Sequence, residues 1–158
     1  MLGSSKARLL GAAFLLASPF LAADASAERM SGREAMAVLR SMGFSPELGT
    51  DSVGDPLIMF QISGLHSQLK FYDCKKSEGR CGSMQLETAV DLEDGMGLQA
   101  ANRFNRRYRY VRMYLDEEMD PYVQYDFEVL HTDAAKHLRS QVEMFGQLLE
   151  SFKDYVDF

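Results

Sequence analysis

Apolar and polar residues alternate with a period of two through the middle of the chain, and this pattern constrains the fold more than any other feature. It runs through residues 56–63, 67–74 and 83–92 and returns in 111–115 and 123–129. Successive side chains of a β-strand point to opposite faces, so each stretch predicts a half-buried strand. The apolar residues that share one predicted face are Ile58, Phe60, Leu69, Phe71, Leu86, Val90, Val111, Met113, Tyr125 and Phe127.

Stretches with helical periodicity surround these runs. The first begins at Ser31, where Glu34 completes a predicted capping box, and ends at Gly43. The second is "GLQAANRFNRRY", which follows the turn "EDGMG". The third starts at His131 and has an apolar stripe with a helical period, formed by Ala135, Leu138, Val142, Phe145, Leu149, Phe152 and Val156.

The long C-terminal helix and the first helix are expected to cover the apolar face of the sheet, because a one-sided sheet must bury that face. A coiled coil is the alternative use of the same stripe. The sequence therefore predicts an α+β fold in the order α-β-β-β-β-α-β-β-α. Its antiparallel sheet has five or six strands, with helices on one face.

The N-terminus is predicted to be a targeting segment. Lys6 and Arg8 precede the apolar stretch "LLGAAFLLASPFLA", and "ASA" before Glu28 has the small-x-small pattern of a cleavage site. We expect residues 1–27 to be a cleaved signal peptide and residues 28–158 to be a single domain, exported to the periplasm of a Gram-negative cell. A retained membrane anchor is the alternative.

The charge of the chain excludes some classes of partner. Its formal net charge is −6 at pH 7, and removal of residues 1–27 makes the mature chain slightly more acidic. Nonspecific binding to nucleic acid or to an anionic membrane requires a basic surface. We therefore expect no nucleic-acid partner and no membrane insertion after cleavage.

The two cysteines, Cys74 and Cys81, flank the short polar loop "KKSEGR" between two predicted strands. In an exported protein this arrangement predicts a structural disulfide that closes a hairpin. Such a bridge stabilises the fold by about 2 to 3 kcal/mol in the chain-entropy estimate. Free thiols, or redox or metal chemistry, are the alternatives.

Two acidic segments, "GTDSVGDP" and "YLDEEMDP", repeat the same spacing of Asp and Pro: Asp51, Asp55 and Pro56 in the first, and Asp116, Asp120 and Pro121 in the second. A calcium loop of the EF-hand type needs more oxygen ligands at alternate positions than either segment offers. Hairpin turns explain the residues without a metal. The echo extends into the helices, so either one helix–strand–strand unit occurs twice or convergent turn geometry produces the likeness.

No catalytic or metal-binding pattern is found. His66, His131 and His137 have no ligand spacing, and no nucleophile motif or phosphate-binding glycine loop occurs. We expect no catalytic residues, no metal and no cofactor. A small exported enzyme or ligand sensor without a sequence signature stays the alternative function.

Two sets of residues are candidates for a partner surface. Arg103, Arg106 and Arg107 lie opposite Leu98, Ala101, Phe104 and Tyr108 on the predicted second helix, and they form either a binding surface or a solvated face. The second set lies on the sheet face opposite the predicted core and comprises Lys70, Tyr72, Tyr110, Arg112, Tyr114 and Gln124. Arginine and aromatic residues are enriched at protein interfaces, although tyrosine is common in any strand.

The segments "ELGTDSVGDPLIMFQISG", "FYDC…C…MQLETAVDL" and "ANRFNRRYRYVRMYLDEEMDPYVQYDFEV", followed by the long helix, resemble the YbjN domain family. Phe104-Asn105-Arg106 is similar to the family's aromatic-Asn-Arg run, with Phe104 where many relatives have Trp. The resemblance implies a fold like that of type III secretion chaperones and a role as a sensory transduction regulator. It supplies no catalytic residues. The predicted function is thus a non-enzymatic periplasmic binding or regulatory module that recognises a protein partner, with a homodimer as one form.

Overall fold

The computed structural model describes residues 29–130 and 133–158 and has the predicted α+β architecture. The described residues form a six-stranded antiparallel sheet in the spatial order β1-β2-β3-β4-β6-β5. The elements, in chain order, are α1 (Gly32–Ser41), β1 (Glu47–Thr50), β2 (Pro56–Ile62), β3 (Leu65–Lys75), β4 (Arg80–Ala89), α2 (Leu98–Arg107), β5 (Arg112–Leu115), β6 (Pro121–Glu128) and α3 (Ala134–Val156). The predicted signal peptide lies outside the described residues. Within the described ranges, no helix has the length and apolar character that a membrane span requires.

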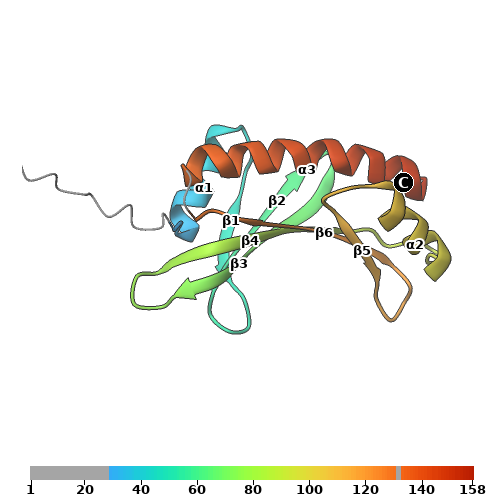
Figure 1. Cartoon of the computed structure of the whole chain (residues 1–158), viewed down its shortest axis with the longest axis horizontal. Coiled ribbons are helices and arrows are strands. Elements are labelled where there is room, and N and C mark those ends of the chain that lie inside the picture. The colour runs from blue at the N-terminus through green and yellow to red at the C-terminus, as the bar shows by residue number, and fades with distance from the viewer. Residues whose placement is uncertain (1–28, 131–132) are drawn as a thin grey trace, which may run out of the picture.

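The helix α3 lies across one face of the sheet, with α1 near its N-terminal end and α2 near its C-terminal end (Figure 1). All ten residues of the predicted apolar face are buried. The stripe of α3 differs from the prediction at its start, because Ala134 is buried and Ala135 is exposed. The expected helix start at His131 lies outside the described residues, and Asp133 caps the helix.

The first helix matches the sequence-based prediction more closely than the second. Ser31 and Glu34 form the predicted capping box of α1, and Gly43 ends that segment at a φ of 91°. Helix α2 packs on the C-terminal part of α3 through Phe104, whose ring contacts Phe152. The sequence had predicted Leu98 on the buried side of α2. The structure instead shows this residue exposed, at the first position of the helix.

The two acidic segments are hairpin turns, as predicted. In the first turn the Oδ1 of Asp51 accepts a hydrogen bond from the amide of Asp55 at 2.8 Å, and Gly54 has a φ of 85°. In the second turn the Oδ1 of Asp116 accepts a hydrogen bond from the amide of Asp120 at 2.9 Å. Each carboxylate thereby satisfies backbone donors of its own turn.

The turns belong to a larger structural repeat. Strands β1 and β2 pair in the same register as β5 and β6, with Thr50 opposite Pro56 and Leu115 opposite Pro121. Each hairpin follows a helix, and the two α-β-β units lie on either side of the central β3–β4 hairpin. A pseudo-two-fold axis perpendicular to the sheet, between β3 and β4, relates the strands of one half to those of the other in order and direction.

Cys74 and Cys81 face each other across the β3–β4 hairpin and form a disulfide. Beyond the sheet, the backbone of Met30 pairs with Cys81 in both directions, at 3.0 and 2.9 Å. The bridge therefore closes the hairpin at the point where the N-terminal segment is attached to it.

Candidate functional site

The sheet face opposite α3, here called the open face, carries the second predicted set of partner-surface residues, except for Tyr110. Tyr72, Arg112 and Tyr114 are exposed on it, from strands β3 and β5. Lys70 and Gln124 are half-buried among them. The open face is therefore polar and aromatic and has no helix of the described chain packed against it (Figure 1).

Strand alternation predicted that Tyr110 shares this face. That prediction assumed a strand that includes Tyr110, and this assumption was wrong. Strand β5 begins only at Arg112, and Tyr110 precedes it with a φ of 70°. Because the residue lies outside the strand, alternation does not determine its direction. Its hydroxyl accepts a hydrogen bond from Arg109 at 3.2 Å.

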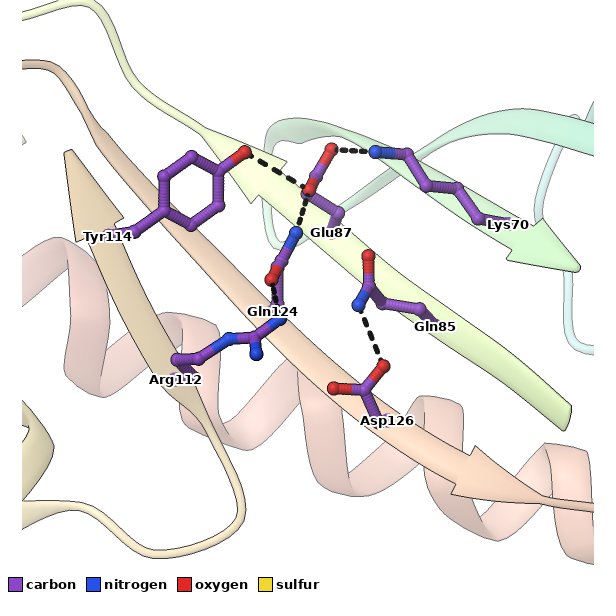
Figure 2. Close-up of polar contacts among 7 residues, drawn as sticks. All are labelled: Lys70, Gln85, Glu87, Arg112, Tyr114, Gln124 and Asp126. Atoms are coloured by element: carbon purple, nitrogen blue, oxygen red, sulfur yellow. Dashed lines mark hydrogen bonds and ion pairs between the residues drawn. The ribbon is translucent and has the colours of Figure 1, made fainter. Parts of the chain in front are cut away.

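The strand registers bring polar side chains from four strands together. Partners directly opposite each other on neighbouring antiparallel strands have closely spaced side chains. Three cross-strand rows result: Gln68-Glu87-Gln124-Arg112, Lys70-Gln85-Asp126 and Tyr72-Ser83-Glu128. Figure 2 shows the polar contacts among members of the first two rows and Tyr114.

Glu87 lies at the centre of this network and is only 5% exposed. Its Oε1 contacts the ammonium group of Lys70 at 2.5 Å, and its Oε2 accepts a hydrogen bond from Gln124 Nε2 at 2.5 Å. Arg112 donates in turn to Gln124 Oε1 (Figure 2). An ionised carboxylate at this depth requires such donors, because its transfer out of water is costly.

Tyr114 covers one side of the Glu87 carboxylate. Its hydroxyl lies 3.4 Å from Glu87 Oε2, and its ring stacks on Tyr122 with centroids 4.9 Å apart. Burial, followed by the nearby negative charge of Glu87, raises the pKa of Tyr114 to about 12. The side chain is therefore a neutral hydrogen-bond donor with a fixed orientation.

Gln85 is the central residue of the second row, between Lys70 and Asp126, and is 6% exposed. Its Nε2 donates to Asp126 Oδ1 at 2.7 Å, which sets the orientation of the amide. Its Oε1 points away from Asp126 (Figure 2) and has no donor among the described residues. A buried acceptor without a donor costs free energy, so this amide marks a position that further hydrogen bonding would stabilise.

A shallow groove of about 530 Å³ opens beside this amide. Tyr72 from β3 lies on one side of the groove, and Asp126 and Glu128 from β6 lie on the other. Between them is Ser83 of β4, whose small side chain leaves space. Arg112 lies at the end where β5 begins. The groove therefore combines an aromatic ring with both signs of charge.

The arginines of α2 form a separate exposed group. Arg103, Arg106 and Arg107 are solvent-exposed, and Arg107 lies over the ring of Tyr108. The described contacts do not join them to the network around Glu87. They belong to the other predicted surface and are not part of the groove.

Asn105, in the predicted family motif, stabilises the edge of the sheet. Its Oδ1 accepts from the amide of Met113 at 2.7 Å, and its Nδ2 donates to the carbonyl of Met113 at 3.0 Å. The side chain thus pairs with β5 as a neighbouring strand would, and it covers an otherwise open edge.

Sequence reasoning missed Glu87, Gln85 and Asp126 as members of the site. Alternation placed the first two on the polar side of their strand, but nothing in the spacing indicated that they would be buried there. Among the described residues, no group of three or more His, Cys, Asp or Glu side chains is placed to hold a metal ion.

Comparison with known proteins identifies the family. No curated protein matches the chain. A model of the YbjN family, described as "Putative bacterial sensory transduction regulator", matches residues 36–158, which include α2, α3 and the whole sheet. The likeness to type III secretion chaperones stays a prediction. The chain belongs to the YbjN family.

Proposed function

We propose that this protein is a non-enzymatic regulatory module that acts in the periplasm and binds a protein partner through the open face of its sheet. The observation that carries the proposal is the exposure of Tyr72, Arg112 and Tyr114 on a face that no helix of residues 29–130 and 133–158 covers, with a groove lined by Tyr72 and Arg112. The family description supports a regulatory role at a coarser level.

The groups on this face are held ready for binding. Arg112 is held by Gln124, and Tyr114 is held by its stacking on Tyr122 and its contact with Glu87. Side chains that are already ordered lose less entropy when a partner arrives. Tyrosine and arginine also contribute a large share of the binding energy in protein interfaces.

The chemistry of the buried acid favours binding over catalysis. Both oxygens of Glu87 are engaged by side chains of the same protein, Lys70 and Gln124. A general acid or base must instead reach a proton on a substrate. The network is therefore better suited to hold the surface in shape than to transfer protons.

Export is supported by the signal-peptide pattern and by the Cys74–Cys81 bridge, which is a type of bond found in oxidising compartments. The test is the intact mass of the protein from a periplasmic extract. We expect a chain that begins at Glu28 and has no alkylatable thiol before reduction. A mass that retains residues 1–27, or alkylation of both cysteines without reductant, would contradict the proposal.

Partner binding is tested by crosslinking capture from an envelope extract, with three forms of the protein compared. The Tyr72→Ala/Arg112→Ala variant removes exposed groups of the open face but leaves the contacts of Tyr114 to the buried acid intact. The matched control, Arg103→Ala/Arg107→Ala, changes exposed groups on α2.

We expect the wild-type protein and the α2 control to capture the same partner, either a second copy of this chain or another protein, and the open-face variant to lose it. All three should melt at nearly the same temperature, because the substituted side chains are exposed. Equal capture by the open-face variant would show that the binding surface lies elsewhere.

A further inference from the structure

Strand β5 leaves the sheet before β6 ends, and a notch remains beside β6. The last register pair is Arg112 opposite Gln124, whereas β6 continues to Glu128. Tyr110, which would face Asp126 if the strand continued, has a φ of 70° and lies outside β5. The second half of β6 therefore has no strand neighbour on that side among the described residues.

The hydrogen-bond pattern of β6 shows which backbone groups the notch exposes. The amide of Val129 donates to Gly82, on the β4 side, at 2.9 Å. Backbone groups alternate between the two edges of a strand, so those of Asp126 and Glu128 point to the β5 side. Both residues thus present an N–H and a C=O to the notch without a ladder partner in the described chain.

The side chains beside the notch set its charge preference. Asp126 and Glu128 are exposed, and they form one side of the groove that Tyr72 borders on the other. Gln85 lines the same groove with a buried Oε1 that has no hydrogen-bond donor in the part of the chain that the structure describes. Arg112 also lines the groove, but its guanidinium donates to Gln124. At the other end, the two carboxylates, the ring face and the buried acceptor favour a guanidinium or ammonium group, which carries positive charge and several N–H donors.

We propose that the notch binds an extended segment of the protein partner that carries an arginine or lysine. Its backbone pairs with Asp126 and Glu128 as a continuation of β5, and its basic side chain enters the groove between the two carboxylates and Tyr72. The inference rests on the proposed function, because the segment belongs to the partner. The notch spans few residues, so backbone pairing alone is weak and the basic side chain supplies the selectivity.

The structural repeat provides an internal comparison. Gln61 on β2 occupies the position equivalent to Asp126, beyond the end of the β1 pairing, and a groove lies beside it as well. Glu47 lines this second groove and has the strand position equivalent to that of Arg112, which lines the first. The two notches share the strand register but differ in side-chain chemistry, so a segment selected by charge should distinguish them.

The experiment titrates the isotopically labelled protein with a short capped peptide of alternating threonine and valine with one central arginine, observed by amide chemical shifts. The matched peptide has glutamate in place of the arginine. The test variant is Asp126→Asn/Glu128→Gln, which removes both charges and keeps the shapes and the Gln85 hydrogen bond. The control variant is Gln61→Asn in the equivalent notch.

With the wild-type protein, the arginine peptide should shift the amides of Asp126, Glu128 and Ser83, and the glutamate peptide should bind at least about tenfold more weakly. The test variant should lose at least about tenfold in affinity for the arginine peptide, and the control variant should bind as the wild type does. Shifts confined to the Gln61 notch, no shifts at Asp126 and Glu128, or equal binding of both peptides would overturn the proposal.

The failure of this inference is distinguishable from that of the proposed function. If Tyr72→Ala/Arg112→Ala abolishes capture of the partner and Asp126→Asn/Glu128→Gln does not, the open face binds but the basic segment is wrong. If the wild-type protein captures no partner and the arginine peptide still binds in the notch, the proposed function fails and the selectivity of the notch stands.

Discussion

The buried ion pair between Lys70 and Glu87 allows a quantitative test of the open-face network. The side chain of Glu87 is 6% exposed and that of Lys70 is 29% exposed, with 2.5 Å between the charged atoms. Lys70→Met removes the cation and keeps the aliphatic length. Glu87→Gln removes the anion and keeps the shape. The double variant removes both charges.

The expected loss of unfolding free energy depends on which charge each substitution leaves without its partner. Removal of one partner of a fully buried pair costs about 3 to 5 kcal/mol, because the other charge is left buried. Water reaches Lys70, and Gln124 still donates to Glu87, so we expect about 2 kcal/mol for Lys70→Met. Glu87→Gln should cost about 1 kcal/mol, since the lysine can extend into solvent. The double variant should also cost about 1 kcal/mol, which gives a coupling of about 2 kcal/mol.

The assay is urea unfolding of the four forms with the disulfide intact, analysed as a double-mutant cycle. The control is Lys75→Met, which breaks the exposed pair with Glu78 in the β3–β4 turn, 3.4 Å apart. That change should cost less than about 0.5 kcal/mol. If Lys70→Met costs no more than the control, or if the effects of the single changes simply add, Glu87 does not depend on its lysine.

Three further predictions concern the core, a tyrosine and the sheet edge. Leu86→Ala should cost about 2 to 4 kcal/mol through lost burial and a cavity, and an unchanged melting curve would contradict the strand register. Ultraviolet titration should show one tyrosine with a pKa of about 12 that is missing in Tyr114→Phe. Because the pKa of Tyr114 is raised in the folded state, its contribution to stability is complete below pH 10.0 and is lost as the pH rises toward about 12. Asn105→Ala should speed hydrogen exchange of the Met113 amide and cost about 1 to 2 kcal/mol; unchanged exchange would show that β5 does not need this cover.

The sequence was sufficient for the order of elements and for the core face. Period-two alternation identified the strands, and the capping box at Ser31 marked the start of α1. The two acidic turns were also predicted correctly, because the hydrogen bonds of Asp51 and Asp116 are local to a few residues. Local geometry of this kind depends little on the rest of the chain.

Errors arose where the end of an element depends on distant contacts. Tyr110 was placed on the open face because the alternation was extended two residues too far. Ala135 was assigned to the buried stripe in place of Ala134, and Leu98 was assigned to a buried side at the exposed end of α2. In each case the residue lies at or just before the start of a helix or strand, where the side-chain period does not determine which side faces the core.

What the sequence determined by itself is therefore the set of strands and helices, the face of each that is buried and the two turns, because these follow from side-chain period and from hydrogen bonds between near neighbours. Only the tertiary structure decided that Glu87, Lys70 and Gln124 meet on the open face and that β6 extends past β5 to leave the notch. Those contacts join residues far apart in the chain, and their register depends on the assembled sheet rather than on any single strand.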